Sequence, residues 1–83
     1  MRKTQEIFGI VVEVVASVMQ RGDLQISRET EVASLGISPD QFVNVVSGIE
    51  TVMIVNFPDD CQTEDCFPTI GDLVDKVHNW QEW

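Results

Sequence analysis

The sequence predicts an all-α protein that folds as a small antiparallel helical bundle with three main helices. Apolar residues recur every three or four positions in three separate stretches, which is the spacing of a buried helical face. Helix-start signals precede these stretches, and polar turn-forming segments separate them. The 83 residues are enough for one domain with a small core, so we treat residues 1–83 as a single domain.

The first helix is expected over residues 4–20, with Thr4 as its cap and Gly22 near its end. Its valine content would also suit a strand, but the stretch is too long for one strand and its long polar residues share a face. The apolar positions with helical spacing are Ile7, Ile10, Val11, Val14, Val15 and Val18.

A polar loop is expected over residues 22–37. A loop of this length without regular structure is unusual and often functional. Its expected anchors on the core are Leu24, Ile26, Val32 and Leu35.

The second helix is expected over residues 39–55, with Pro58 as its terminator. It opens with serine at the cap, proline at the first helical position and glutamine three residues after the cap, in the order Ser38-Pro39-Asp40-Gln41. The expected buried stripe is Phe42, Val45, Val46, Ile49, Val52 and Met53. The residues expected to face out are Asp40, Asn44, Ser47, Glu50 and Thr51.

The third main helix is expected over residues 70–80, after an acidic segment, residues 59–66, that is expected to hold one short helical turn. Thr69 and Asp72 have the spacing of a capping box, which marks the helix start. The expected inner stripe is Ile70, Leu73, Val74, Val77 and Trp80.

Charge and composition exclude several classes of function. The net charge of -9 disfavours nucleic acid as a partner and favours basic proteins.

We expect no membrane span and no signal peptide, because no apolar run is long enough and Glu6 and Glu13 interrupt the first one. Two cysteines are too few for a disulfide framework. The default expectation is therefore a cytoplasmic protein, and we expect a monomer.

Three motifs together resemble the acyl or peptidyl carrier protein family. Residues 35–40 read Leu-Gly-Ile-Ser-Pro-Asp, residues 57–60 read Phe-Pro-Asp-Asp, and residues 69–74 read Thr-Ile-Gly-Asp-Leu-Val. In that family a Leu-Gly pair leads into an Asp-Ser-Leu motif at the start of helix two. An apolar-Pro-Asp-acidic segment follows that helix, and Thr-x-x-Asp-Leu opens the last one. The order and spacing of the motifs carry the resemblance, which covers nearly the whole chain.

The resemblance implies a four-helix bundle, with the short helix in the acidic segment, and a phosphopantetheine arm that carries intermediates as thioesters. It implies that the carrier itself catalyses nothing. Its partners would be a phosphopantetheinyl transferase and the synthase or synthetase enzymes that load and modify the cargo. The sequence departs from the family at the attachment motif. Pro39 occupies the family's serine position, and Ser38 lies one residue earlier.

We interpret Ser38 as the attachment residue, shifted by one position. An arm phosphate there would meet the free N–H groups and positive dipole end of a helix. Asp40, Val43, Asn44 and Ser47 are the predicted partner-facing residues. The face is less acidic than that of many fatty-acid carriers, which favours polyketide or nonribosomal peptide synthesis over fatty acid biosynthesis. The alternatives are that Ser38 is only a helix cap, and that the chain is an unmodified carrier-like scaffold or regulatory module.

No catalytic or metal-binding set is predicted. The single histidine, His78, has no nucleophile with an orienting group around it in the sequence. Cys61 and Cys66 could form a disulfide or a metal site, but their spacing suits zinc poorly, so two unlinked thiols are expected. The acidic segment around them lacks the ligand pattern of a calcium loop.

Overall fold

The computed structural model describes residues 2–81, apart from the side chain of Glu64. Its three α-helices are α1 (Thr4–Met19), α2 (Pro39–Met53) and α3 (Ile70–Trp80). Three 3-10 turns lie in the connections, namely η1 (Val32–Leu35), η2 (Asp59–Cys61) and η3 (Glu64–Cys66). The predicted all-helical fold with three main helices is therefore confirmed. The acidic segment holds two 3-10 turns where one helical turn was expected.

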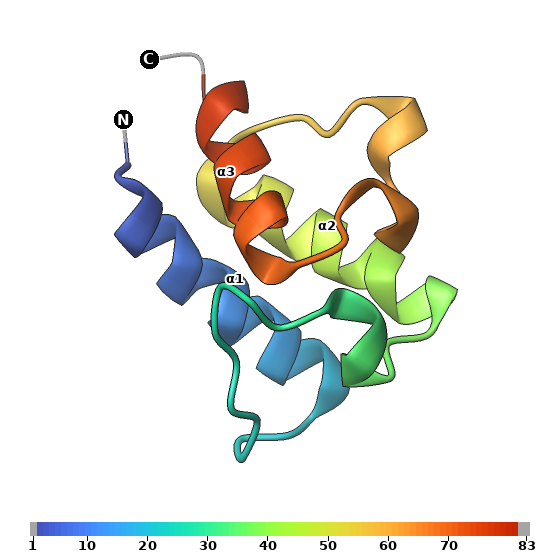
Figure 1. Ribbon diagram of the computed structural model, residues 1–83. Coiled ribbons are helices and arrows are strands. Elements are labelled where there is room, and N and C mark those ends of the chain that lie inside the picture. Colours follow the sequence, from blue (N-terminus) through green and yellow to red (C-terminus); the bar gives the residue numbers. More distant parts are fainter. Residues whose placement is uncertain (1, 82–83) are drawn as a thin grey trace.

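Helix α1 packs against both α2 and α3 (Figure 1). The start of α1 and the end of α3 lie together. The Arg2 amide donates to Oε1 of Gln81 at 2.7 Å, and Nε2 of Gln81 donates to the Arg2 carbonyl at 3.0 Å. Since the beginning of one helix thus meets the end of the other, α1 and α3 are antiparallel.

The core is made of apolar side chains from all three helices and from the connections between them. Four aromatic rings form one cluster at its edge, with neighbouring ring centroids 4.9–6.1 Å apart: Phe42, Phe57, Phe67 and Trp80. Val55, Phe57 and Phe67 are buried although they lie outside the helices. The four expected loop anchors also pack on the core, with Val32 buried and Leu24, Ile26 and Leu35 partly so.

The ends of α1 differ from the expectation. Lys3 occupies the cap position and gives no side-chain hydrogen bond, so the prediction that Thr4 caps this helix is wrong. Gln20 takes the left-handed conformation at the other end, with φ 55°, where Gly22 had been expected near the helix end. A short hydrogen-bonded turn closes this end, because the Arg21 amide donates to the Ala16 carbonyl at 3.0 Å.

One position of the α2 stripe is also different. Val52 is 46% exposed, whereas Phe42, Val45, Val46, Ile49 and Met53 are buried as predicted. Positions 52 and 53 both continue the spacing from Ile49, one on each side of the stripe. Of these two positions, only Met53 reaches the core.

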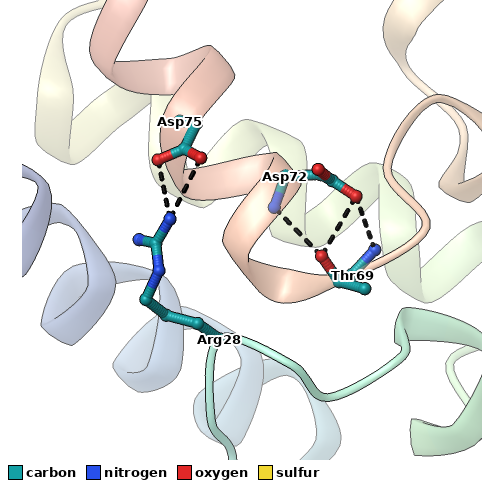
Figure 2. A network of polar contacts seen from close by, with 4 residues as sticks. All are labelled: Arg28, Thr69, Asp72 and Asp75. Atoms are coloured by element: carbon teal, nitrogen blue, oxygen red, sulfur yellow. Dashed lines mark hydrogen bonds and ion pairs between the residues drawn. The ribbon is translucent and has the colours of Figure 1, made fainter.

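The long loop is tied to the start of α3 by backbone and side-chain bonds. The Ile70 amide donates to the Thr30 carbonyl at 2.9 Å, and the Gly71 amide donates to the Arg28 carbonyl at 2.8 Å. Figure 2 shows Nη2 of Arg28 between the two carboxylate oxygens of Asp75, at 2.9 and 3.0 Å. The loop thus has a defined course before it reaches α2.

The predicted capping box at α3 is confirmed. The Asp72 amide donates to Oγ1 of Thr69 at 3.2 Å, and the Thr69 amide donates to Oδ2 of Asp72 at 3.3 Å (Figure 2).

Among the helices that the structure describes, none has the length and apolar character needed to cross a membrane.

Candidate functional site

Ser38 is the cap residue of α2 and lies exposed on the surface. Its Oγ accepts a hydrogen bond from the Gln41 amide at 3.2 Å, and its own amide donates to Oε1 of Gln41 at 3.0 Å. These two bonds form the capping box that the sequence predicts. The hydroxyl oxygen therefore already satisfies one donor of the helix start.

The residues before Ser38 explain why it projects into solvent. Gly36 ends η1 in the left-handed conformation, with φ 73°, which a residue without a side chain adopts at low cost. Ile37 follows and is buried in the core. A turn at Gly36 and an anchor at Ile37 thus bring the chain to the surface at Ser38, and Pro39 begins the helix with a preset φ.

The backbone donors around Ser38 are few. The amide of Phe42 already bonds the Ser38 carbonyl at 2.9 Å, and Pro39 has no N–H group. The Asp40 amide is one group of the first turn that a phosphate on Ser38 could reach. The Gln41 amide could reach it only by leaving Oγ of Ser38, to which it donates at 3.2 Å. The Asp40 carboxylate belongs to the same first turn and would oppose the charge of a phosphate on Ser38. Such a phosphate would therefore meet one available N–H group, a second that must change its partner, and one like charge.

The predicted partner-facing residues share one exposed face of α2. Positions 43 and 44 each lie three or four residues from both position 40 and position 47, so the four residues share one face of the helix. The structure leaves Asp40, Asn44 and Ser47 exposed, and Val43 is 51% exposed. We call this row the α2 strip: Asp40, Val43, Asn44 and Ser47. It carries one carboxylate, one amide, one hydroxyl and one apolar group, and it begins at Asp40, two residues after Ser38.

Glu50 was expected to face out, but it has a structural contact. Its Oε2 accepts a hydrogen bond from the Phe57 amide at 2.9 Å, and its side chain is partly buried. The bond holds the chain that leaves α2 against the end of the helix. Glu50 therefore contributes less to the exposed face of α2 than the sequence alone indicated.

Ile54, next to Glu50 at the end of α2, was not singled out from the sequence. It is 82% exposed and has φ 56°, an uncommon conformation for a β-branched residue. No sequence signal marks this position, because left-handed helix ends are typical of glycine or asparagine. It adds an apolar group beyond the end of the α2 strip.

Cys61 and Cys66 are free thiols in this structure, and both are partly buried. The pKa of the Cys66 thiol is raised, mainly by the hydrogen bond with the Cys61 side chain and to a lesser extent by desolvation.

Within residues 2–81, leaving aside the Glu64 side chain, no three potential metal ligands of the His, Cys, Asp or Glu type come together.

No family model, curated protein or solved structure matches this chain. The resemblance to carrier proteins therefore rests on the three sequence motifs. The structural observation that bears on the predicted attachment residue is the exposed position of Ser38 at the cap of α2.

Proposed function

We propose that this chain is a discrete acyl or peptidyl carrier protein, a four-helix-type bundle of that family. In this proposal a phosphopantetheine arm on Ser38 holds biosynthetic intermediates as thioesters, in polyketide or nonribosomal peptide synthesis. The carrier works as a cytoplasmic monomer and catalyses nothing itself. The observation that carries the proposal is the position of Ser38, an exposed hydroxyl at the start of a long helix, reached through a well-anchored loop.

The chemistry of attachment is compatible with this position. Oγ of Ser38 would form a bond to the phosphorus of the pantetheine phosphate of coenzyme A, lose its proton to a base and displace adenosine 3′,5′-bisphosphate. Phosphate oxygens near a helix start are stabilised by free N–H groups and by the helix dipole. The Asp40 amide would supply one donor, and the Gln41 amide would supply a second by moving from Oγ of Ser38 to a phosphate oxygen. A phosphopantetheinyl transferase must approach the exposed side of α2 to deliver the arm.

The α2 strip is the proposed docking surface for the transferase and for the synthase or synthetase enzymes. Its single carboxylate, Asp40, lies nearest to Ser38, and the exposed Val43 follows in the next turn. An apolar contact flanked by an amide and a hydroxyl suits recognition by packing more than by charge. This supports a partner other than the strongly basic enzymes that dock on acidic fatty-acid carriers.

A second candidate function is an unmodified carrier-like scaffold or regulatory module. The observation that favours it is the capping box, because Oγ of Ser38 already accepts the Gln41 amide. Pro39 and Asp40 would also hinder an ordinary transferase, since one removes a donor and the other adds like charge. In this alternative the α2 strip remains a protein-binding surface without an arm.

An intact-mass measurement distinguishes the two functions. The chain is incubated with coenzyme A and a broad-specificity phosphopantetheinyl transferase, and the carrier proposal expects one added phosphopantetheine. Ser38→Ala should abolish the addition. Ser38→Asp is the sharper variant, because aspartate keeps a good helix cap but has no hydroxyl. Ser34→Ala is the matched control, since Ser34 is also exposed and should be dispensable.

A restored motif separates a lost site from a poor transferase. The triple variant Ser38→Asp, Pro39→Ser and Asp40→Leu recreates the family's Asp-Ser-Leu sequence at the same helix start. If the triple variant accepts the arm and the natural chain does not, the scaffold function is supported. If a folded Ser38→Asp chain still accepts the arm, the assignment of Ser38 is wrong.

A further inference from the structure

The two cysteines terminate consecutive 3-10 turns that contact each other. Cys61 ends η2 and Cys66 ends η3, and both side chains pack partly buried against the core. Sγ of Cys66 donates a hydrogen bond to the carbonyl oxygen of Asp60 at 3.0 Å. Asp60 directly precedes Cys61, so the Cys66 thiol is folded back onto the neighbour of the other cysteine. The four intervening residues form the short connection between the two thiols.

We propose that Cys61 and Cys66 are a reversible dithiol–disulfide pair, which a low-molecular-weight disulfide such as glutathione disulfide oxidises. This assigns a redox modification site to the connection between α2 and α3. It is independent of the arm on Ser38 and requires no partner protein.

The oxidation proceeds in two exchange steps. The Cys61 thiol loses its proton to water, and its sulfur attacks one sulfur of glutathione disulfide. An S–S bond to glutathione forms, and one glutathione leaves as a thiolate. The Cys66 thiol then loses its proton and attacks the Cys61 sulfur of this mixed disulfide, which releases the second glutathione. Two electrons and two protons leave the protein, and one glutathione disulfide becomes two glutathione molecules.

The structure assigns the order of attack. The hydrogen bond to Asp60 holds the Cys66 proton in place, and the interaction with Cys61 raises the pKa of this thiol, so that Cys66 forms the thiolate less readily. Only the thiolate is the nucleophile, so Cys66 is the slower thiol to react with an external disulfide. Cys66 is therefore the residue that resolves the mixed disulfide.

The pair lies next to residues that hold the fold. The Cys66 carbonyl accepts a hydrogen bond from Nζ of Lys76 on α3 at 3.0 Å. The next residue, Phe67, stacks on Phe42 of α2 with ring centroids 6.0 Å apart. A disulfide would fix the segment that joins these two contacts. Because a crosslink that fits the native geometry restricts the unfolded chain, the oxidised protein should be the more stable form.

The test uses the full chain in buffers of reduced and oxidised glutathione, with acid quenching, alkylation of remaining thiols and intact mass. We expect a species that has lost two hydrogens and takes up no alkylating agent. The same titration in denaturant is the reference. The folded chain should form the disulfide at a severalfold more reducing glutathione ratio, and its thermal midpoint should rise on oxidation.

Two single variants test the order of attack and serve as controls for each other. Cys66→Ser should accumulate a glutathione adduct on Cys61, and Cys61→Ser should form its adduct on Cys66 severalfold more slowly. Equal rates would overturn the assigned order. The proposal itself is overturned if the folded chain forms the disulfide no more readily than the denatured chain, or if oxidation lowers the thermal midpoint.

Discussion

The amide of Gly71 in the first turn of α3 donates a hydrogen bond to the carbonyl of Arg28 in the long loop, at 2.8 Å. A Cβ atom added at Gly71 would lie 2.9 Å from that carbonyl oxygen, closer than Cβ contacts in proteins allow. The loop can approach the helix this closely only because residue 71 has no side chain.

The first prediction concerns this contact. Gly71→Ala should destabilise the protein by about 1–3 kcal/mol, because backbone must move to make room. Gly9→Ala is the matched control. Gly9 is an exposed α1 residue with no atom within 4 Å of its added Cβ, so the substitution should stabilise by about 0.5–1 kcal/mol. Urea unfolding of both variants measures the difference, and shifts in the same direction would contradict the prediction.

The second prediction concerns the strained end of α2. Ile54→Gly should stabilise the protein by about 1 kcal/mol, because glycine adopts the left-handed conformation without a Cβ clash. Little packing is lost, since Ile54 is 82% exposed. Val52→Gly is the control in ordinary helical conformation, and it should destabilise by several tenths of a kcal/mol. A loss of stability in Ile54→Gly would show that its side chain makes a stabilising contact.

The third prediction concerns the centre of the α2 stripe. Ile49 is fully buried, and Ile49→Ala should cost about 2–5 kcal/mol through lost burial and a residual cavity. Asn44→Ala, on the exposed face of the same helix, should change stability by less than about 0.5 kcal/mol. Thermal and chemical unfolding of both variants provide the measurement. Equal effects would mean that the stripe does not face the core.

The fourth prediction concerns pH. Interaction with Cys61 and desolvation raise the pKa of Cys66 above its ordinary value of 9.0, so the folded state holds this proton more tightly than the unfolded state. The associated stability is fully present below the unfolded pKa and is lost as pH rises through the folded one. Under reducing conditions, the wild type should therefore lose more stability than Cys66→Ser between pH 7 and strongly alkaline pH. Parallel curves would contradict this.

The helices were predictable because their signals are local. The capping boxes at Ser38 and Thr69 depend on residues three apart, and the buried stripes depend on helical spacing. Buried residues in the connections, such as Phe57 and Phe67, have no such period. Their burial follows from how the helices meet, which a single stretch of sequence does not record.

The candidate site was predictable only in part, for the same reason. The exposure of Ser38 and of the α2 strip follows from the position of a cap and the face opposite a buried stripe. The bond from Glu50 to the Phe57 amide depends on the path of the chain after α2. The left-handed conformation of Ile54 contradicts the preference of that residue type, so tertiary structure must impose it.

The pair of hydrogen bonds between Arg2 and Gln81 holds the start of α1 against the end of α3. A short peptide could join these two positions, and new termini could then be opened in the exposed loop near Gly22, as a circular permutant. Figure 1 shows the start of α1 and the end of α3 on the opposite side of the molecule from the start of α2. A tag, a solid support or a fused enzyme attached before α1 or after α3 would therefore leave the surface around Ser38 open to solvent.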